Sequence, residues 1–189
     1  RSFLGYFLSL ILSSVPRRLK KMIKLSGTSR PLSLLSAATR SRIQKIQSEE
    51  VNSDFDKIII HHTATRRDLR FDVNWCTRLH LNNGWRDIGY HLYVEADGTL
   101  SMGRPLSMAG AHCRGQNSDS IGIAYVGGKN ASGENEFTMT PVQANCIKEA
   151  IAHLRSELDK ELPVHGHREF RATFCPGFDV QDEAQWPDV

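Results

Sequence analysis

The chain has 189 residues, of which 40% are hydrophobic and 24% charged, which is the length and composition of one globular domain with a sizeable core. Residues 1–50 carry ten Lys or Arg against two acids, a net charge of +8, which leaves −5 for residues 51–189. This division excludes a uniformly basic nucleic-acid binder, and we expect no nucleic-acid partner. No apolar run reaches the roughly 20 residues that a spanning helix needs, which excludes a multispan membrane protein.

The basic front of the chain begins with a short apolar run at residues 3–15, followed after Pro16 by the cluster RRLKKMIK. A run of this length suits a signal-peptide core or an interfacial segment better than a membrane span, although a signal peptide usually carries its positive charge before the run. Residues 31–47 have a rough amphipathic stripe with Arg and Ser, as organelle transit peptides do. We therefore treat 1–50 as a basic, Ser-rich, partly helical extension that serves membrane contact or targeting, or is a disordered tail.

From residue 51 onward the pattern mixes strands with two longer helices. The β-branched run at 57–61 is typical of a buried central strand. Asp72 can cap one helix, and Thr140–Pro141 can cap and begin the other. We expect one α/β domain over 51–189, with a mixed central sheet flanked by helices on both faces. The predicted elements are strand 57–61, helix 73–83, strand 89–96, a turn at Asp97–Gly98, strand 99–103, strand 120–126, helix 141–160 with the stripe Ile147, Ile151, Leu154 and Leu158, and a final short strand to which Pro163–Val164 leads.

Four cysteines in 189 residues, without a CxxC pair, are too sparse for a disulfide scaffold. Cys76 and Cys146 lie in helical patterns, and we expect both to be free buried thiols. The sequence leaves open whether Cys76 pairs with Cys113.

Three places carry residues suited to chemistry. His61–His62 ends the predicted strand, at the position where α/β sheets open to ligands. His165-Gly-His167 follows a second short apolar segment, and Cys175 comes eight residues later, before Pro176–Gly177. Two nitrogens and one sulfur are ligands that zinc takes in catalytic sites with an open position. Polar residues at strand ends are the alternative reading of the same histidines.

These residues belong to a series of motifs that resembles the type 2 N-acetylmuramoyl-L-alanine amidases, a family that includes phage lysozyme-type amidases and peptidoglycan recognition proteins. The resemblance covers roughly residues 55–180 and not the basic front. The motifs, in family order, are IHHTAT at 60–65, WRDIGYH at 85–91, DGT at 97–99, GRP at 103–105, GAH at 110–112, NSDSIGI at 117–123, HGHRE at 165–169 and CPGFD at 175–179.

The resemblance implies that His61, His167 and Cys175 hold one Zn²⁺ ion, with Tyr90 as the catalytic tyrosine. It implies hydrolysis of the amide between N-acetylmuramic acid and L-alanine, by a water molecule whose pKa zinc lowers. The family's phage members carry lysine two residues before the ligand cysteine, where this chain has Thr173. Thr173 supplies a hydrogen bond without the positive charge of lysine. The sequence therefore leaves open which residue acts as the proton shuttle.

Three further residues are predicted to contact substrate. His112 does so by resemblance, and Arg104 could meet a peptide carboxylate, with a surface salt bridge as the equal alternative. Asn117 is a candidate glycan contact or a turn residue.

Other polar residues receive structural predictions. His62 should point to the strand face opposite His61, and His153 should face solvent. His165 should either support a ligand or the loop, or be a metal ligand itself, and the sequence leaves these alternatives open. Glu169 should start a helix or lie on the surface.

The leading function is therefore a zinc peptidoglycan amidase, such as a phage endolysin or related lytic enzyme. The alternative is a recognition protein of the same fold that binds peptidoglycan without cutting it, although such proteins usually lose a zinc ligand. Polymerase inhibition, found in some phage members, has no specifying residues in 51–189. The expected partners are peptidoglycan and, through residues 1–50, an anionic membrane or outer envelope. We expect a monomer that acts on the bacterial cell wall.

Overall fold

The computed structural model describes residues 37, 41, 44–46 and 50–187. The apolar run at 3–15 and the basic cluster after it lie outside the described residues. Within the described part, no helix has both the length and the apolar character to cross a membrane.

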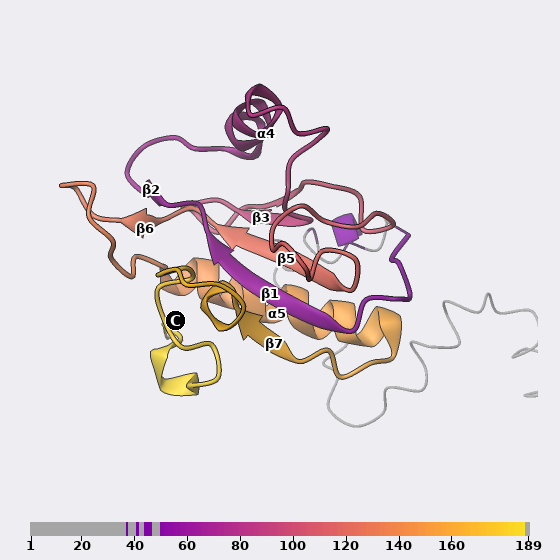
Figure 1. Cartoon of the computed structure of the whole chain (residues 1–189). Helices are drawn as coiled ribbons and strands as arrows, with labels where there is room; N and C mark the ends of the chain where they lie inside the picture. Colours follow the sequence, from indigo (N-terminus) through magenta and orange to yellow (C-terminus); the bar gives the residue numbers. More distant parts are fainter. Residues whose placement is uncertain (1–36, 38–40, 42–43, 47–49, 188–189) are drawn as a thin grey trace, which may run out of the picture. The chain divides into compact units, whose positions relative to one another are not determined.

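The centre of the domain is a five-stranded mixed sheet in the order β4-β3-β5-β1-β7 (Figure 1). β5 is the central strand, and β1 lies beside it, paired in parallel with β5 on one side and with the edge strand β7 on the other. β3 runs parallel to β5, and β4 is antiparallel to β3. The strands are β1 Lys57–His62, β3 Leu92–Val94, β4 Leu100–Met102, β5 Ser120–Tyr125 and β7 Val164–Gly166, and a separate parallel pair is formed by β2 Thr65–Arg66 and β6 Gly128–Lys129.

The two helices predicted after residue 51 begin where their capping residues predict. α4 spans Val73–Asn82, and the Asp72 side chain accepts a hydrogen bond from Trp75 N at 2.7 Å. α5 spans Pro141–Leu158, and Thr140 forms a reciprocal capping box with Gln143. Two short 3₁₀ helices follow, η2 at His167–Glu169 and η3 at Glu183–Gln185.

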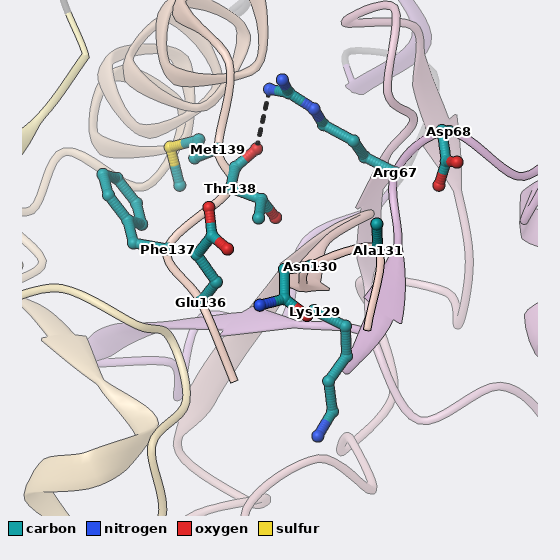
Figure 2. A pocket seen from close by; sticks show the side chains of 9 residues that line it. All are labelled: Arg67, Asp68, Lys129, Asn130, Ala131, Glu136, Phe137, Thr138 and Met139. Atoms are coloured by element: carbon teal, nitrogen blue, oxygen red, sulfur yellow. Dashed lines mark hydrogen bonds between the residues drawn. The ribbon is translucent and has the colours of Figure 1, made fainter. Parts of the chain in front are cut away.

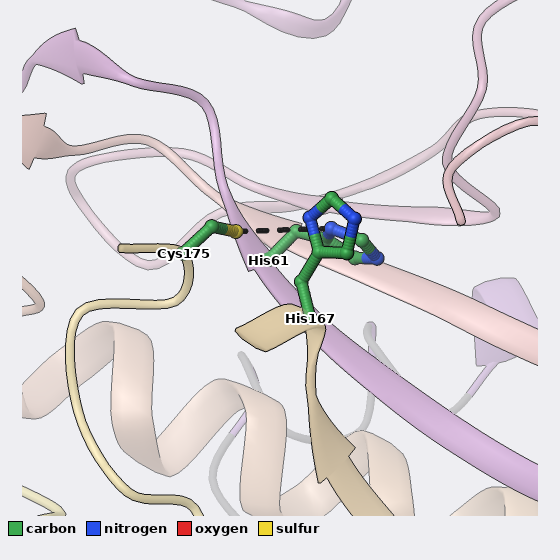
Figure 3. Close-up of side chains that lie close together, drawn as sticks. All are labelled: His61, His167 and Cys175. Atoms are coloured by element: carbon green, nitrogen blue, oxygen red, sulfur yellow. Dashed lines mark hydrogen bonds between the residues drawn. The ribbon is translucent and has the colours of Figure 1, made fainter. Parts of the chain in front are cut away.

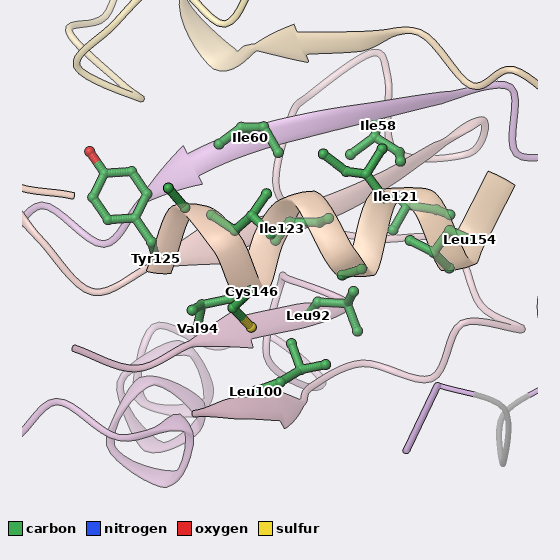
Figure 4. Packing of buried hydrophobic residues seen from close by; sticks show 14 of the residues in the cluster. Ile58, Ile60, Leu92, Val94, Leu100, Ile121, Ile123, Tyr125, Cys146 and Leu154 are labelled. Carbon is green, nitrogen blue, oxygen red and sulfur yellow. The ribbon is translucent and has the colours of Figure 1, made fainter. Parts of the chain in front are cut away.

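The helices cover opposite faces of the sheet, which confirms the predicted layers (Figure 1). α5 packs its apolar stripe on Ile58 and Ile60 of β1 and on their neighbours in β5, β3 and β4 (Figure 4). On the other face, Cys76 of α4 packs against Tyr93 and Ala124. Because side chains alternate along a strand, β1 sends Ile58 and Ile60 into the α5 core and turns His61 to the opposite face.

The predicted strand 89–96 is shorter in the structure, where β3 covers only Leu92–Val94. Before β3, the backbone of 89–91 bonds mostly to residues 103–111: Ala111 N donates to Gly89 O, and Arg104 N donates to Tyr90 O. Only His91 N reaches the sheet, where it donates to Gly122 O of β5 at 2.9 Å. β3 therefore begins only at Leu92, and the segment that carries Tyr90 is held against residues 103–111.

His153 is not solvent-facing as predicted, because its side chain is only 11% exposed. The buried face of α5 is wider than the four-residue stripe suggested, since it also contains Cys146 and Ala150. His153 lies three residues after Ala150 and so borders this face.

The core reaches in front of residue 51. Ile46 is 1% exposed and belongs to the same cluster as Ile58. Lys45 Nζ donates to Leu100 O at 2.6 Å. The described residues just before 51 thus contribute to packing of this domain.

The cysteines agree with the prediction of buried thiols. Cys76 and Cys146 are buried in α4 and α5. Cys76 and Cys113 are both free, so no disulfide joins them.

Candidate metal centre

Three donors meet at the carboxyl end of β1. His61 lies near the end of this strand, His167 begins η2 directly after β7, and Cys175 lies in the loop that follows. Their ligand atoms lie within 4.8 Å of one another (Figure 3). The Cys175 Sγ atom is 3.8 Å from His61 Nδ1, and the ring centroids of His61 and His167 are 4.5 Å apart. The structure thus brings together the three residues predicted as metal ligands.

Burial keeps both histidines of this cluster neutral. It lowers the pKa of His61 well below its usual value, and the neighbouring His112 and His167 lower it further. Burial also lowers the pKa of His167, with a smaller contribution from Arg171. Neutral imidazoles offer lone pairs to a metal.

Burial also raises the pKa of the Cys175 thiol, to about 12, while the His62 backbone N–H, 3.2 Å from Sγ, acts in the opposite direction. A bound cation reverses this preference, because a coordinating thiol loses its proton. Two imidazole nitrogens and one sulfur form a donor set that suits Zn²⁺.

The turn that presents His167 is fixed by Glu169. Its carboxylate accepts a hydrogen bond from Gly166 N at 2.5 Å and lies 2.6 Å from His165 Nδ1. The Glu169 side chain therefore caps the start of the short helix η2, which agrees with its predicted helix-start role, and His165 bonds to this turn outside the three-donor cluster.

Tyr90 and Thr173 each lie next to one of the donors. The Tyr90 ring centroid is 5.3 Å from that of His61. Burial raises the pKa of the phenol, and the thiols of Cys175 and Cys76 raise it further, so the hydroxyl keeps its proton. The Thr173 hydroxyl accepts a hydrogen bond from Cys175 N at 3.3 Å, and its side chain is exposed.

His112, predicted as a substrate contact, lies directly against a metal-ligand candidate. Its Nδ1 is 3.0 Å from His61 Nε2. Asn117 supports it from behind, because its Oδ1 accepts hydrogen bonds from His112 N at 2.8 Å and Cys113 N at 2.9 Å. Asn117 thus has the turn role that was one of its two predicted readings.

Arg104 directs its guanidinium at backbone carbonyls. It donates to Ile88 O at 2.8 Å, Ala109 O at 3.0 Å and Asp87 O at 3.4 Å. These bonds tie the loop after β4 to the segment before Tyr90. The predicted contact with a peptide carboxylate stays a prediction.

His62 lies on the opposite face of β1, as predicted. Its ring approaches Tyr125 and Phe174, with centroid distances of 6.2 and 6.0 Å. Its Nδ1 accepts a hydrogen bond from Ala64 N at 3.0 Å.

One buried residue near the site had no role in the sequence analysis. His91 accepts a hydrogen bond from Gly122 N at 2.9 Å, and its Nε2 donates to Met108 O at 2.9 Å. It occupies the last position of the motif at 85–91, and this position is the only sequence signal for it.

A separate pocket of about 430 Å³ lies between the β2–β6 pair and the segment before α5 (Figure 2). Arg67 crosses it and donates to Thr138 O at 3.3 Å. Its lining mixes cations with carboxylates and includes none of the metal-ligand candidates. It is lined by Arg67, Asp68, Lys129, Asn130, Ala131, Glu136, Phe137, Thr138 and Met139.

Comparison with known proteins agrees with this geometry. Residues 51–178 match the family described as N-acetylmuramoyl-L-alanine amidase. The endolysin of Enterobacteria phage K11 is 31% identical over 141 residues, which cover 75% of this chain and 90% of that protein. Peptidoglycan-recognition protein SC2 of Drosophila melanogaster is 31% identical over 133 residues, covering 66% of this chain and 70% of the relative. A solved endolysin amidase from Clostridium intestinale superposes with a TM-score of 0.56 at 30% identity, covering 69% of this chain and 81% of that one. The chain therefore belongs to the N-acetylmuramoyl-L-alanine amidase family.

Proposed function

We propose that the chain is a zinc-dependent amidase that cuts the amide between N-acetylmuramic acid and the L-alanine of the peptidoglycan stem peptide. The observation that carries this proposal is the cluster of His61, His167 and Cys175, with ligand atoms within 4.8 Å of one another. It occurs in a member of the amidase family, at the residues that the resemblance assigns to the metal.

The side chains of the site have separate tasks in this proposal. His61, His167 and Cys175 hold the ion. A bound Zn²⁺ polarises the scissile carbonyl and lowers the pKa of a water molecule. The protonated Tyr90 hydroxyl donates a hydrogen bond to the carbonyl oxygen as negative charge develops there. Thr173 adds a neutral hydroxyl beside Cys175, where a lysine would have added a charge.

A recognition protein that binds peptidoglycan without hydrolysis is the second candidate, and the similarity to peptidoglycan-recognition protein SC2 favours it. The two candidates differ in one product. Only an amidase releases free stem peptide from intact glycan strands, whereas a recognition protein leaves the polymer unchanged.

The test is digestion of purified peptidoglycan, with chromatography of the released peptides and reducing sugars. We expect stem peptides without new reducing ends, loss of the activity in chelator, and recovery on addition of Zn²⁺. Cys175→Ser should lose zinc and activity together. Cys146→Ala, which changes a buried cysteine of α5, is the matched control and should keep both. Binding of peptidoglycan without peptide release would favour the recognition protein.

The basic extension supports a contact beyond the cell wall. Its +8 charge beside an apolar run suits attraction to an anionic membrane or outer envelope. Similarity to phage endolysins supports a lytic role for the whole protein, and we propose that it acts as a monomer.

A further inference from the structure

We propose that His112 is a positioning residue that fixes the tautomer of His61, so that the His61 Nδ1 lone pair points to the metal centre. The proposal rests on the proposed zinc function, and it is carried by one contact. His61 Nε2 lies 3.0 Å from His112 Nδ1, while His61 Nδ1 lies 3.8 Å from Cys175 Sγ. The two nitrogens of the His61 ring thus have different neighbours.

The His112 ring lies in a slot that two glycines leave open. A Cβ atom at Gly110 would be 2.4 Å from His112 Cδ2, and one at Gly122 would be 2.5 Å from the same atom. The backbone of His112 is held by Asn117 Oδ1. The ring is therefore fixed in position before any ligand binds.

The proton positions follow from Ser120. The Ser120 hydroxyl donates to Gln116 O, and its oxygen is 3.5 Å from His112 Nε2. The Ser120 carbonyl oxygen, 3.4 Å from the same nitrogen, can only accept. Both protein atoms facing His112 Nε2 are thus acceptors, and this nitrogen carries the proton.

A neutral His112 with its proton on Nε2 has a lone pair on Nδ1. This lone pair accepts from His61 Nε2–H, which leaves Nδ1 of His61 unprotonated and facing Cys175. In the opposite arrangement, His112 Nδ1–H would donate to His61. His112 Nε2 would then be an unprotonated acceptor that faces two other acceptors, the hydroxyl and carbonyl oxygens of Ser120. Hydrogen bonds to the outer nitrogen of a ligand histidine set its tautomer and ring orientation in this way.

The experiment compares the wild type with His112→Leu and His112→Asn, two side chains of nearly equal shape. Asparagine keeps an acceptor oxygen close to the position of Nδ1, and leucine does not. His153→Asn, a histidine change on α5 away from the donors, is the control. Two properties are measured: the affinity for Zn²⁺ by competition with a chromophoric chelator, and the histidine tautomers of the metal-free protein by long-range ¹H–¹⁵N NMR.

In the wild type, both His61 and His112 should carry their proton on Nε2. His112→Leu should weaken zinc binding by about 10- to 100-fold and mix the tautomers of His61. His112→Asn should restore most of the affinity and the single tautomer, and His153→Asn should change neither.

The NMR measurement on the wild type can reject the proposal by itself, if it finds His61 protonated on Nδ1. The proposal therefore stays testable even if a variant fails to fold. Equal zinc affinity in His112→Leu and wild type would also overturn it. A wild-type protein that binds no zinc would instead reject the proposed function, and the tautomers of the metal-free protein would still decide the role of His112.

Discussion

The position and protonation of Tyr90 suit the hydrogen bond to the scissile carbonyl oxygen that we propose for it. Its ring packs against that of His61, and burial keeps the phenol protonated. Tyr90→Phe removes the hydroxyl and little else, so we expect kcat for stem-peptide release to fall by about 10²- to 10³-fold with zinc affinity unchanged. Steady-state kinetics on a soluble muropeptide, together with metal analysis, would check this. A kcat within threefold of the wild type would remove Tyr90 from the chemistry.

His91 gives the fold a dependence on pH. Burial lowers its pKa to about 4 in the folded protein, against about 6.5 when the chain is unfolded. Between these values the unfolded chain binds a proton that the folded protein does not, so stability is full above pH 6.5 and falls as the pH drops toward 4. The loss at low pH is about 3 kcal/mol at most for this residue.

Urea unfolding of zinc-free protein from pH 7 to 4.5 measures this dependence. The slope of the unfolding free energy with pH should be smaller in His91→Gln than in the wild type by about one proton, or about 1.4 kcal/mol per pH unit. His62 and His112, whose pKa values are lowered to about 4 and about 3, act in the same direction in both proteins. Identical slopes would show that His91 is not the titrating group.

The start of α5 is set by a single capping box. The Thr140 hydroxyl accepts from Gln143 N at 3.3 Å, while the Gln143 side chain accepts from Thr140 N at 3.0 Å. Thr140→Ala should lower the free energy of unfolding by about 1 kcal/mol and leave zinc affinity unchanged. Thr77→Ala is the matched control, because the Thr77 hydroxyl bonds back to Val73 O inside α4 and caps nothing. Denaturant unfolding of both variants would separate a cap effect from loss of a threonine.

Local sequence patterns are sufficient to predict a helix or strand when the residues of that element, or its capping residue, indicate where it lies. The β-branched run predicted β1 within one residue, and Asp72 and Thr140 predicted the starts of both helices. The late start of β3 at Leu92 could not be predicted, because most backbone partners of residues 89–91 lie at 103–111, which come later in the chain.

At the metal centre too, local motifs predict some features, whereas others depend on contacts between distant parts of the chain. The three ligand candidates came from motifs, and the structure brings them together. The contact between His61 and His112 joins residues 51 positions apart and depends on two glycines that leave room for a ring. Such a contact has no local signature, since it follows from the pairing of β1 with β5 and from the loop before β5.

For the whole molecule, the buried Ile46 predicts that the domain needs residues before 51. A chain of residues 37–189 should match the unfolding free energy of the full-length protein. A chain of residues 51–189 loses the buried Ile46 side chain and the Lys45 contact, and should be less stable by about 2 kcal/mol. Thermal and urea unfolding of the three chains would measure this, and equal stability of the two shorter chains would contradict it.

The longer of these two shortened chains, residues 37–189, also tests the role of the basic front. Residues 37–189 should release stem peptide from isolated peptidoglycan at the full-length rate, because the donors and Tyr90 are retained. On whole cells its lytic activity should fall, and high salt should lower the activity of the full-length protein more than that of the short one. Equal whole-cell activity would leave the seven positive charges of residues 1–36 without an envelope role.

The donors of the metal centre also have a consequence for folding. His61 and Cys175 are 114 positions apart, and β1 lies between two parallel partners, so the centre assembles only when distant parts of the chain have met. An ion held by these donors binds the native state and not the open chain, which adds about 4 kcal/mol of stability at a thousandfold excess over its Kd. A bound ion would therefore link β1, through His61, to the loop that carries Cys175, and chelation would remove this link. Loss of the ion would withdraw the chemistry and, at the same time, ease the opening of the sheet to heat and proteases.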